Sequence, residues 1–362
     1  MNKIFFLGMV SLFFCCKNNI NINDNYWKNN NTYIIEKTNK NYVLNQDLII
    51  PKKCTLIIKN GVNINIKSGN ILNNGCFFIG DNTDSLNINI NSSKSNIYNN
   101  SKTHLNINNT FLKNINIINK NSDLFITNSN FNNCNLKISD SKFVSDDCYF
   151  NKNIININNS YVLFKNSILK TNEPIYLKNN KNISLNNCLF YHSNEGFIFN
   201  KNKKIHIINS VFFYNKSVFI MNNKNVYGNF FNNLFIKNDV VFETKDSSQF
   251  YFINNIFHEN ETVFKAFFDR KIKKSIISKN NIYYNNYKNF QVKNINISNS
   301  YNICNNDSLM GYYNIYQDPL FIDPENFNYN FLKKSPALRS GTNNTNIGTN
   351  INNINIIKYL YK

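Results

Sequence analysis

Short runs in which apolar and polar residues alternate recur along most of the chain. Examples are Ile64-Asn65-Ile66, Ile88-Asn89-Ile90 and Ile155-Asn156-Ile157. Alternation with a period of two predicts strands that bury one face and expose the other. No stretch of the sequence keeps a 3.6-residue periodicity, and asparagine disfavours helix interiors because its amide competes for backbone hydrogen bonds. The pattern therefore predicts many short strands joined by asparagine-rich bends.

A phrase that begins with asparagine and ends in an apolar residue repeats between these strands. Successive copies begin at Asn166, Asn186, Asn209, Asn232, Asn254 and Asn280. By subtraction the steps are 20, 23, 23, 22 and 26 residues, which excludes helical repeats with periods of about 33 to 47 residues. A solenoid whose every coil adds one strand to each of a few parallel sheets fits this period. Asparagine at the bends tolerates left-handed backbone, and stacked amides can hydrogen-bond along the axis.

Two stretches resemble the ends of a known fold. Residues 47–80, DLIIPKKCTLIIKNGVNINIKSGNILNNGCFFIG, resemble the first coil of right-handed parallel β-helix proteins of the pectate-lyase-like superfamily. Residues 318–341, DPLFIDPENFNYNFLKKSPALRSG, resemble the segment that closes such stacks. The resemblance implies an all-β, single-stranded, right-handed parallel β-helix and says little about activity.

The resemblance and the repeat together divide the chain into four expected segments. These are a signal peptide (residues 1–16), a linker with an N-terminal cap (17–45), the β-helix (46–345) and a C-terminal tail (346–362). At about 22 residues a coil, the repeat region holds about twelve coils and forms a rod of roughly 60 Å.

The N-terminus resembles a bacterial lipoprotein signal. Lys3 precedes an apolar run from Ile4 to Phe14, and Cys15 and Cys16 follow directly. We expect lipidation at Cys16, with Cys15 as the alternative, and therefore a protein of the cell envelope that is anchored to a membrane by lipid. An ordinary secretory signal, which would leave the protein secreted, is the other interpretation.

Composition and charge limit the classes of molecule that the protein is expected to bind. Hydrophobic residues make up 42% of the chain, enough to bury a core. The net charge is +19, which favours anionic partners. Only Arg270 and Arg339 are arginines, however, and base readers depend on the guanidinium fork. We therefore expect no specific binding of nucleic acid.

The six cysteines after residue 16 have two interpretations. Cys54 and Cys76 are 22 residues apart, so they are expected in adjacent coils, either as a disulfide or as two buried thiols. Cys134 and Cys188 are too far apart along the stack to pair. No CxxC motif occurs, so no zinc site is expected.

Catalytic phrases of the superfamily are incomplete here. The hydrolases of the superfamily resemble one another in Asn-Thr-Asp, Asp-Asp and Gly-His-Gly phrases. The residues of the first two phrases occur here as Asn82-Thr83-Asp84 and Asp146-Asp147. Asp84 and Asp146 are, however, 62 residues apart by subtraction, and the sequence contains no Gly-His-Gly. We interpret the two matches as coincidence in a chain rich in asparagine and aspartate.

The best local cluster of charged residues lies between residues 239 and 274. Asp239 and Glu261 are 22 residues apart, so we expect them on one face of neighbouring coils. Asp269 and Arg270 follow, and a basic residue there suits proton abstraction in a β-elimination. Glu243, His258 and Glu259 belong to the same stretch. Asp239, Glu261, Asp269 and Arg270 are the candidate catalytic residues, although we favour the explanation that charges on solvent-facing loops gather here without a catalytic role.

We expect a cell-envelope β-helix lipoprotein that binds an extended polymer such as a polysaccharide without catalysis. Rows of Tyr, Asn and Lys along a sheet suit an extended sugar chain. The alternatives are a polysaccharide lyase or glycoside hydrolase, and a surface scaffold or adhesin. No cofactor is expected, except Ca²⁺ if the protein is a lyase.

Overall fold

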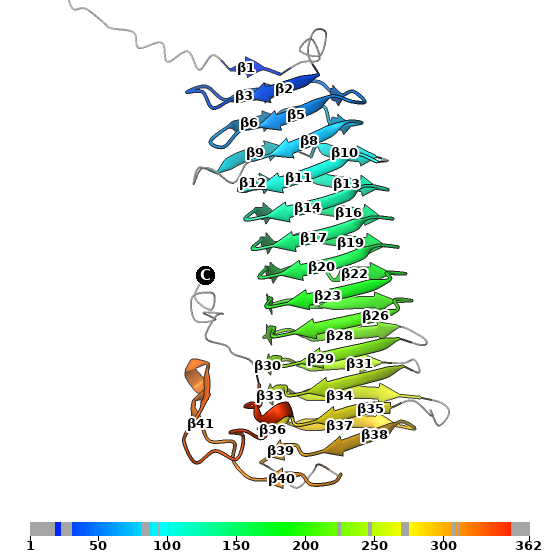
Figure 1. Ribbon diagram of the computed structural model, residues 1–362, viewed down its shortest axis with the longest axis vertical. Coiled ribbons are helices and arrows are strands. Elements are labelled where there is room, and N and C mark those ends of the chain that lie inside the picture. The colour runs from blue at the N-terminus through cyan, green and yellow to red at the C-terminus, as the bar shows by residue number, and fades with distance from the viewer. Residues whose placement is uncertain are drawn as a thin grey trace, which may run out of the picture.

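The computed structural model of the chain describes residues 19–22, 31–80, 87–92, 94–100, 102–222, 226–244, 248–268, 275–305, 309 and 311–348. Within these residues the strands form three parallel sheets of 15, 13 and 12 strands, here called sheets A, B and C, and a separate strand pair. Each coil runs from sheet B to sheet A to sheet C (Figure 1). The protein is thus a right-handed parallel β-helix of about twelve coils, which confirms the predicted fold.

The strands are short in all three sheets. Sheet A contains β1 (Ile20–Asn21), β3 (Tyr42–Leu44), β6 (Asn63–Ile66), β9 (Ile88–Ser92), β12 (Thr110–Lys113), β15 (Asn130–Asn132), β18 (Tyr149–Asn151), β21 (Ile168–Lys170), β24 (Leu189–Tyr191), β27 (Val211–Phe213), β30 (Leu234–Ile236), β33 (Ile256–His258), β36 (Ile282–Tyr284), β39 (Ile303–Cys304) and β40 (Ile315–Tyr316). Sheet B contains β2 (Thr32–Ile35), β5 (Thr55–Ile58), β8 (Cys76–Ile79), β11 (His104–Asn108), β14 (Asp123–Thr127), β17 (Lys142–Asp146), β20 (Tyr161–Lys165), β23 (Asn182–Asn186), β26 (Lys204–Ile208), β29 (Tyr227–Phe231), β32 (Gln249–Ile253), β35 (Ser275–Lys279) and β38 (Asn296–Ser300). Sheet C contains β4 (Leu48–Ile50), β7 (Ile71–Asn73), β10 (Asn96–Asn100), β13 (Asn116–Lys120), β16 (Asn135–Ser139), β19 (Ile154–Asn158), β22 (Ile175–Lys178), β25 (Phe197–Asn200), β28 (Ser217–Asn222), β31 (Val240–Thr244), β34 (Thr262–Phe267) and β37 (Lys288–Lys293).

The core is built from like residues stacked in register. In sheet A, Phe212 pairs with Phe235 and Phe235 with Phe257. Their ring centroids are 5.1 and 5.0 Å apart and the rings are nearly parallel. All three side chains are fully buried. In strands such as β14, β16 and β19, alternate residues are buried in the core and the residues between them face outward, as the alternating pattern predicts.

Polar ladders follow the three corners between the sheets. At the corner between sheets A and C, the backbone N–H of Asn215 donates to Asn238 Oδ1, and that of Asn238 donates to Asn260 Oδ1, both at 3.0 Å. Asn238 Nδ2 also donates to the carbonyl of Phe212 at 3.0 Å. The amide oxygens therefore accept from backbone N–H groups that are buried at the bends, outside the strands. This confirms the predicted asparagine ladder.

The residue before many ladder positions has a left-handed backbone. Asn232, which precedes the ladder residue Asn233, has a φ of 54°, and Lys237, which precedes Asn238, has a φ of 50°. Asparagine adopts this conformation more readily than most residues. A left-handed residue followed by a ladder residue makes a compact bend, so a coil can turn from one sheet to the next within two residues.

Both ends of the stack differ from the expected boundaries at residues 46 and 345. At the N-terminus, β1 and β2 already pair with β3 and β5, so the parallel sheets start before residue 46. At the C-terminus, the last parallel strand is β40, and the chain continues in β41 (Phe321–Asp323), the 3₁₀ helix η2 (Pro324–Asn326), the antiparallel strand β42 (Asn328–Phe331) and the 3₁₀ helix η3 (Thr342–Asn344). No helix in these described ranges is long and apolar enough to cross a membrane.

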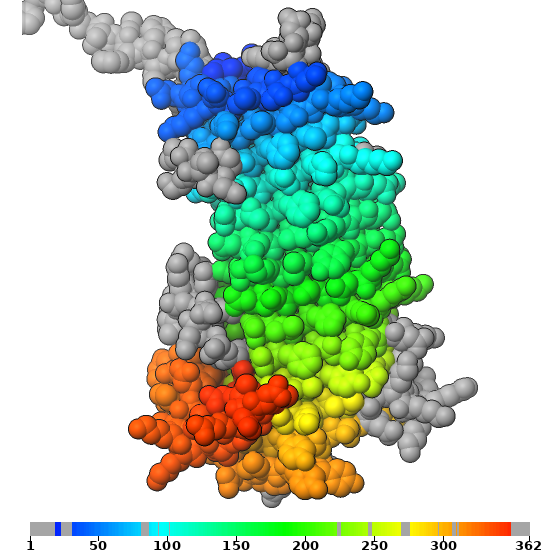
Figure 2. All heavy atoms as spheres, in the orientation of Figure 1, coloured from blue at the N-terminus to red at the C-terminus, as the bar shows by residue number. Residues whose placement is uncertain are grey.

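The C-terminal segment, residues 318–348, stands out from one side of the stack (Figure 2). Phe321, Tyr329, Ala337 and Ile347 pack against the outer face of sheet A, where strands β24 to β39 carry apolar residues. Burying this second apolar face is favourable by roughly 25 cal/mol per Å² of surface removed from water. The segment is therefore a structural cover of sheet A.

The cysteines of the described chain are all free thiols. Cys76 pairs in register with Thr55, one residue beyond Cys54, so the step between these two coils is 21 residues and the two side chains are offset. Cys134, Cys148 and Cys188 occupy ladder positions, and the backbone N–H of Cys134 donates to Asn153 Oδ1 at 2.7 Å. Burial raises the pKa of Cys134 and Cys148 to about 11 and that of Cys188 to about 12.

Alkylation of the native protein should therefore discriminate among the thiols. The thiolate is the reactive form, so we expect iodoacetamide at about pH 8 to spare Cys134, Cys148 and Cys188 and to modify Cys76, which is only half-buried. Peptide mapping by mass spectrometry measures this, with the protein unfolded in guanidinium as the control. Equal modification of Cys76 and Cys188 in the native state would contradict the ladder position of Cys188.

Candidate functional site

A hollow of about 630 Å³ opens on the outer surface of sheet C. Its wall comes from five consecutive coils, those that contain β22, β25, β28, β31 and β34. At about 4.8 Å a coil, four steps give a length of about 19 Å along the axis. We call this hollow the sheet C groove, and its charged residues are Glu173, Glu195, Lys216, Asp239, Glu243 and Lys265.

An ion pair lies inside the sheet C groove. Glu243 on β31 is in register with Lys265 on β34, and Lys265 Nζ lies 3.4 Å from Glu243 Oε2. The side chain of Glu243 is 19% exposed and that of Lys265 35%. Both residues follow a buried phenylalanine in the alternating pattern, so they point outward. The groove thus presents fixed charges of both signs to solvent.

Asp239 and Glu261 occupy equivalent places on neighbouring coils. Each directly precedes one of the paired residues Val240 and Thr262, and the N–H of Thr262 donates to the carbonyl of Asp239 at 2.8 Å. Both side chains are exposed. Asp239 lines the sheet C groove, and Glu261 lies one coil further along the same corner. The candidates Asp269 and Arg270 lie outside the described residues.

His258 and Glu259, although close in sequence to this group, lie elsewhere. His258 ends β33 in sheet A, whereas the groove lies on sheet C. In a coil of three sheets, a shift of a few residues moves a side chain from one face of the rod to another. The sequence cluster at residues 239–274 is therefore divided between two faces.

Four charged residues of the groove were not predicted from the sequence: Glu173, Glu195, Lys216 and Lys265. Glu173 and Glu195 each lie two residues before a member of the pair Ile175 and Phe197, and their spacing is 22 residues by subtraction. That spacing equals the repeat, so it was a usable signal. Ser217 pairs with Val240. Lys216 directly precedes Ser217, and Asp239 directly precedes Val240. Lys216 and Asp239 are thus neighbours on one corner.

A second hollow, of about 510 Å³, lies where five coils enter sheet B. It runs along the starts of β11, β14, β17, β20 and β23 and has Lys102, Asp123, Asp140, Lys142, Tyr161 and Lys181 in its wall. We call it the sheet B groove. Its length is also about 19 Å by the same spacing. The sheet B groove and the sheet C groove thus both run parallel to the axis of the rod.

The sequence-matched Asp146 does not lie in either groove. Asp146 Oδ2 instead pairs with Lys165 Nζ at 3.0 Å across neighbouring strands of sheet B, and Asp84 lies outside the described residues. Across the described part of the chain, no three acidic, histidine or cysteine side chains converge closely enough to hold a metal ion.

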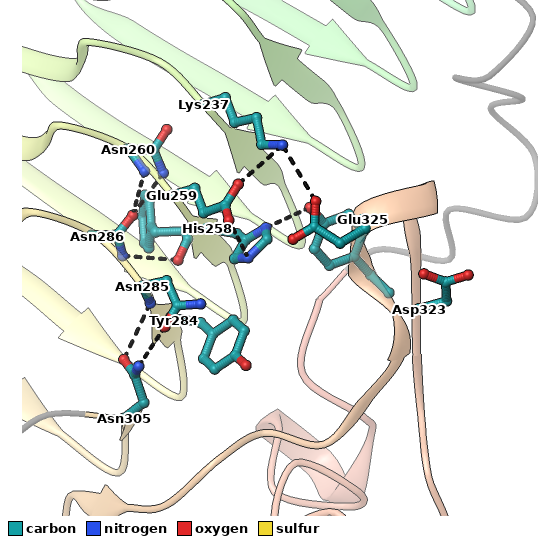
Figure 3. A network of polar contacts seen from close by, with 12 residues as sticks. Lys237, His258, Glu259, Asn260, Tyr284, Asn285, Asn286, Asn305, Asp323 and Glu325 are labelled. Carbon is teal, nitrogen blue, oxygen red and sulfur yellow. Dashed lines mark hydrogen bonds and ion pairs between the residues drawn. The ribbon is translucent and has the colours of Figure 1, made fainter.

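A polar network with a buried histidine joins sheet A to the C-terminal segment (Figure 3). His258 is 1% exposed, and its Nδ1 lies 2.7 Å from Tyr329 Oη. Lys237 Nζ lies 3.1 Å from Glu259 Oε2 and 3.7 Å from Glu325 Oε2. Burial, together with the charge of Lys237, lowers the pKa of His258, against the opposing effect of the Glu259 and Glu325 carboxylates.

The network predicts a loss of stability in acid. The unfolded chain binds a proton at His258 near pH 6.5, while the folded chain binds it only at lower pH. This contribution to stability is therefore complete above about pH 6.5 and is lost as the pH falls through the lowered pKa. We expect the urea midpoint to fall between about pH 7.5 and pH 5, and to fall less in His258→Gln. Parallel pH curves for the two proteins would contradict this role of His258.

The comparisons with known proteins do not name a family. No known protein family matches the sequence. No curated protein matches it either. Among solved structures, a tailspike protein (a double mutant) of the E. coli bacteriophage HK620 is similar, with 10% identity and a TM-score of 0.35 over 82% of this chain and 72% of that chain. A likeness this distant assigns no function, so the functional argument rests on the residues of this chain.

Proposed function

We propose that this protein is a non-catalytic β-helix of the cell envelope that binds an extended polysaccharide. The observation that carries the proposal is the pair of grooves, each lined by five consecutive coils and running along the axis. A linear polymer lying along such a groove meets a similar set of groups at each coil, so its contacts add up along the chain. Open grooves rather than one deep pocket suit a long ligand.

The side chains of the grooves support a sugar ligand. The sheet B groove combines Tyr161 with serines and asparagines at the coil starts, and aromatic faces and amides are suitable partners for sugar rings and hydroxyls. We further propose that lipidation at Cys16, or alternatively Cys15, anchors the protein to a membrane. Those two residues lie outside the described ranges, so the anchor rests on the sequence alone.

A second candidate function is cleavage of the polysaccharide. Asp239 and Glu243 line one groove together with Lys265, and carboxyl groups of this kind serve as acid and base in glycoside hydrolysis. A lyase would instead need a base and, in the resembled superfamily, Ca²⁺. The ion pair between Glu243 and Lys265 occupies a carboxylate that a hydrolase would require, which favours binding over catalysis. The scaffold or adhesin interpretation needs no groove at all.

One experiment separates these functions. The purified chain is passed over immobilised acidic, neutral and amine-bearing polysaccharides, and the same polymers are assayed for new reducing ends and unsaturated products, with and without Ca²⁺. We expect retention without cleavage. Cleavage that disappears in Asp239→Asn or Glu243→Gln would replace binding by catalysis as the function. If the chain neither retains nor cleaves any of the polysaccharides, the polysaccharide proposal is contradicted and the scaffold is favoured.

A further inference from the structure

The sheet C groove has the opposite charge to the molecule that contains it. The chain carries a net charge of +19. Its sheet C groove nevertheless has four carboxylates (Glu173, Glu195, Asp239 and Glu243) against two lysines, which gives −2 by subtraction. The sheet B groove has three lysines against two aspartates, which gives +1 with histidine neutral. The two grooves are therefore electrostatically different sites on one basic rod.

The carboxylates form a row rather than a single cluster. Glu173 and Glu195 lie in the same column of adjacent coils, two residues before the paired Ile175 and Phe197. Ser217 continues this column, because it lies two residues before Phe219, the partner of Phe197. Asp239 and Glu243 follow one coil further on. Negative charges thus recur along about 19 Å of groove, which matches a ligand with repeated positive charges better than one small ion.

A buried hydroxyl in the same wall has no partner. Ser217 is 9% exposed, lines the groove between Glu195 and Val240, and its Oγ makes no hydrogen bond to any described atom of the protein. Buried hydroxyls are nearly always hydrogen-bonded. Val240, the partner of Ser217 on the next coil, lines the same groove, which places Ser217 on the groove side of the strand. A ligand hydroxyl or amine in the groove would supply the missing partner.

We infer that the sheet C groove binds a polysaccharide that carries protonated amines, that is, an amino-sugar polymer with free amino groups. The inference rests on the proposed function and specifies the ligand class of this groove. Ammonium groups donate to the carboxylates of Glu173, Glu195 and Asp239, and the Ser217 hydroxyl bonds to a ring substituent. Charge-assisted hydrogen bonds of this kind are the strong ones. An acidic ligand, which the net charge of the chain favours, would bind to lysines outside this groove.

The test compares oligomers of β-1,4-linked glucosamine with their fully N-acetylated counterparts by titration calorimetry at low salt. We expect the wild-type chain to bind the charged oligomer at least about tenfold more tightly than the acetylated one. The double variant Glu173→Gln/Glu195→Gln should lose about tenfold in affinity for the charged oligomer, because each exposed pair contributes up to about fivefold. The matched control is Asp123→Asn/Asp140→Asn in the sheet B groove, which should change this affinity less than about twofold.

Ser217→Ala adds a readout that a structural role would not give. Removal of an unpartnered buried hydroxyl should leave the melting temperature unchanged or higher, while affinity for the charged oligomer falls several-fold. Equal affinity for charged and acetylated oligomers, or an unchanged affinity in the double glutamate variant, would overturn the amine inference and leave polysaccharide binding intact. Failure to retain any polysaccharide would overturn the proposed function itself.

Discussion

Replacing Phe235 by alanine is expected to lower the free energy of unfolding by about 3–5 kcal/mol. The ring is fully buried and lies between those of Phe212 and Phe257, at 5.1 and 5.0 Å. The stacked rings cannot collapse into the space, because each is fixed by the register of its own strand. Urea unfolding followed by circular dichroism measures the loss. The matched control is Phe267→Ala on the outer face of β34, where the side chain is 47% exposed.

Phe267→Ala should change the free energy of unfolding by less than about 1 kcal/mol. Phe235→Leu, which keeps most of the apolar volume, should lie between the two alanine variants. A loss at Phe235 no larger than that at Phe267 would contradict the core stack, because the two residues would then be equally solvated.

Replacing Asn238 by alanine is expected to cost about 2–5 kcal/mol. Its Oδ1 accepts from the backbone and the side chain of Asn215, both at 3.0 Å. Its Nδ2 donates to the carbonyl of Phe212 at 3.0 Å and to Asn260 Oδ1 at 2.9 Å. Alanine leaves the Asn215 N–H buried without its partner, which costs about 1–3 kcal/mol, and removes three further hydrogen bonds worth about 0.5–1.5 kcal/mol each.

Two further variants separate the ladder from a general effect of asparagine. Asn238→Ser should lose less stability than Asn238→Ala, since Ser210 and Ser167 serve at ladder positions elsewhere. Asn89→Ala removes an exposed side-chain amide that donates to Asn63 Oδ1 on β6, and should change stability by less than about 0.5 kcal/mol. Equal losses for Asn238→Ala and Asn89→Ala would contradict the ladder.

Much of this fold could be predicted because a solenoid is specified locally. Alternation predicts strands, and asparagines such as Asn209 and Asn232 mark left-handed bends at φ of 52° and 54°. The exact period could not be predicted, because steps vary with the bends. Between Ser129 and Cys148 the step is 19 residues by subtraction, and between Asn255 and Asn281 it is 26.

The candidate site was harder to predict because it depends on the place of each residue within its coil. The spacing of Asp239 and Glu261 equals one repeat, so their proximity followed from the sequence. The equal spacing of Glu173 and Glu195 holds the same information. His258 could not be assigned, since only the bounds of β33 place it on sheet A and under the C-terminal segment. The missing partner of Ser217 depends on packing and has no sequence signal.

The most direct test of the account measures affinity against ligand length. The purified chain is titrated with fragments of graded length from the polysaccharides that it is expected to retain. Each groove crosses five coils, so affinity should rise with length until the fragment spans about 19 Å and then level off. Affinity that is complete for a single sugar, or absent at every length, would contradict a polymer lying along the axis of the β-helix.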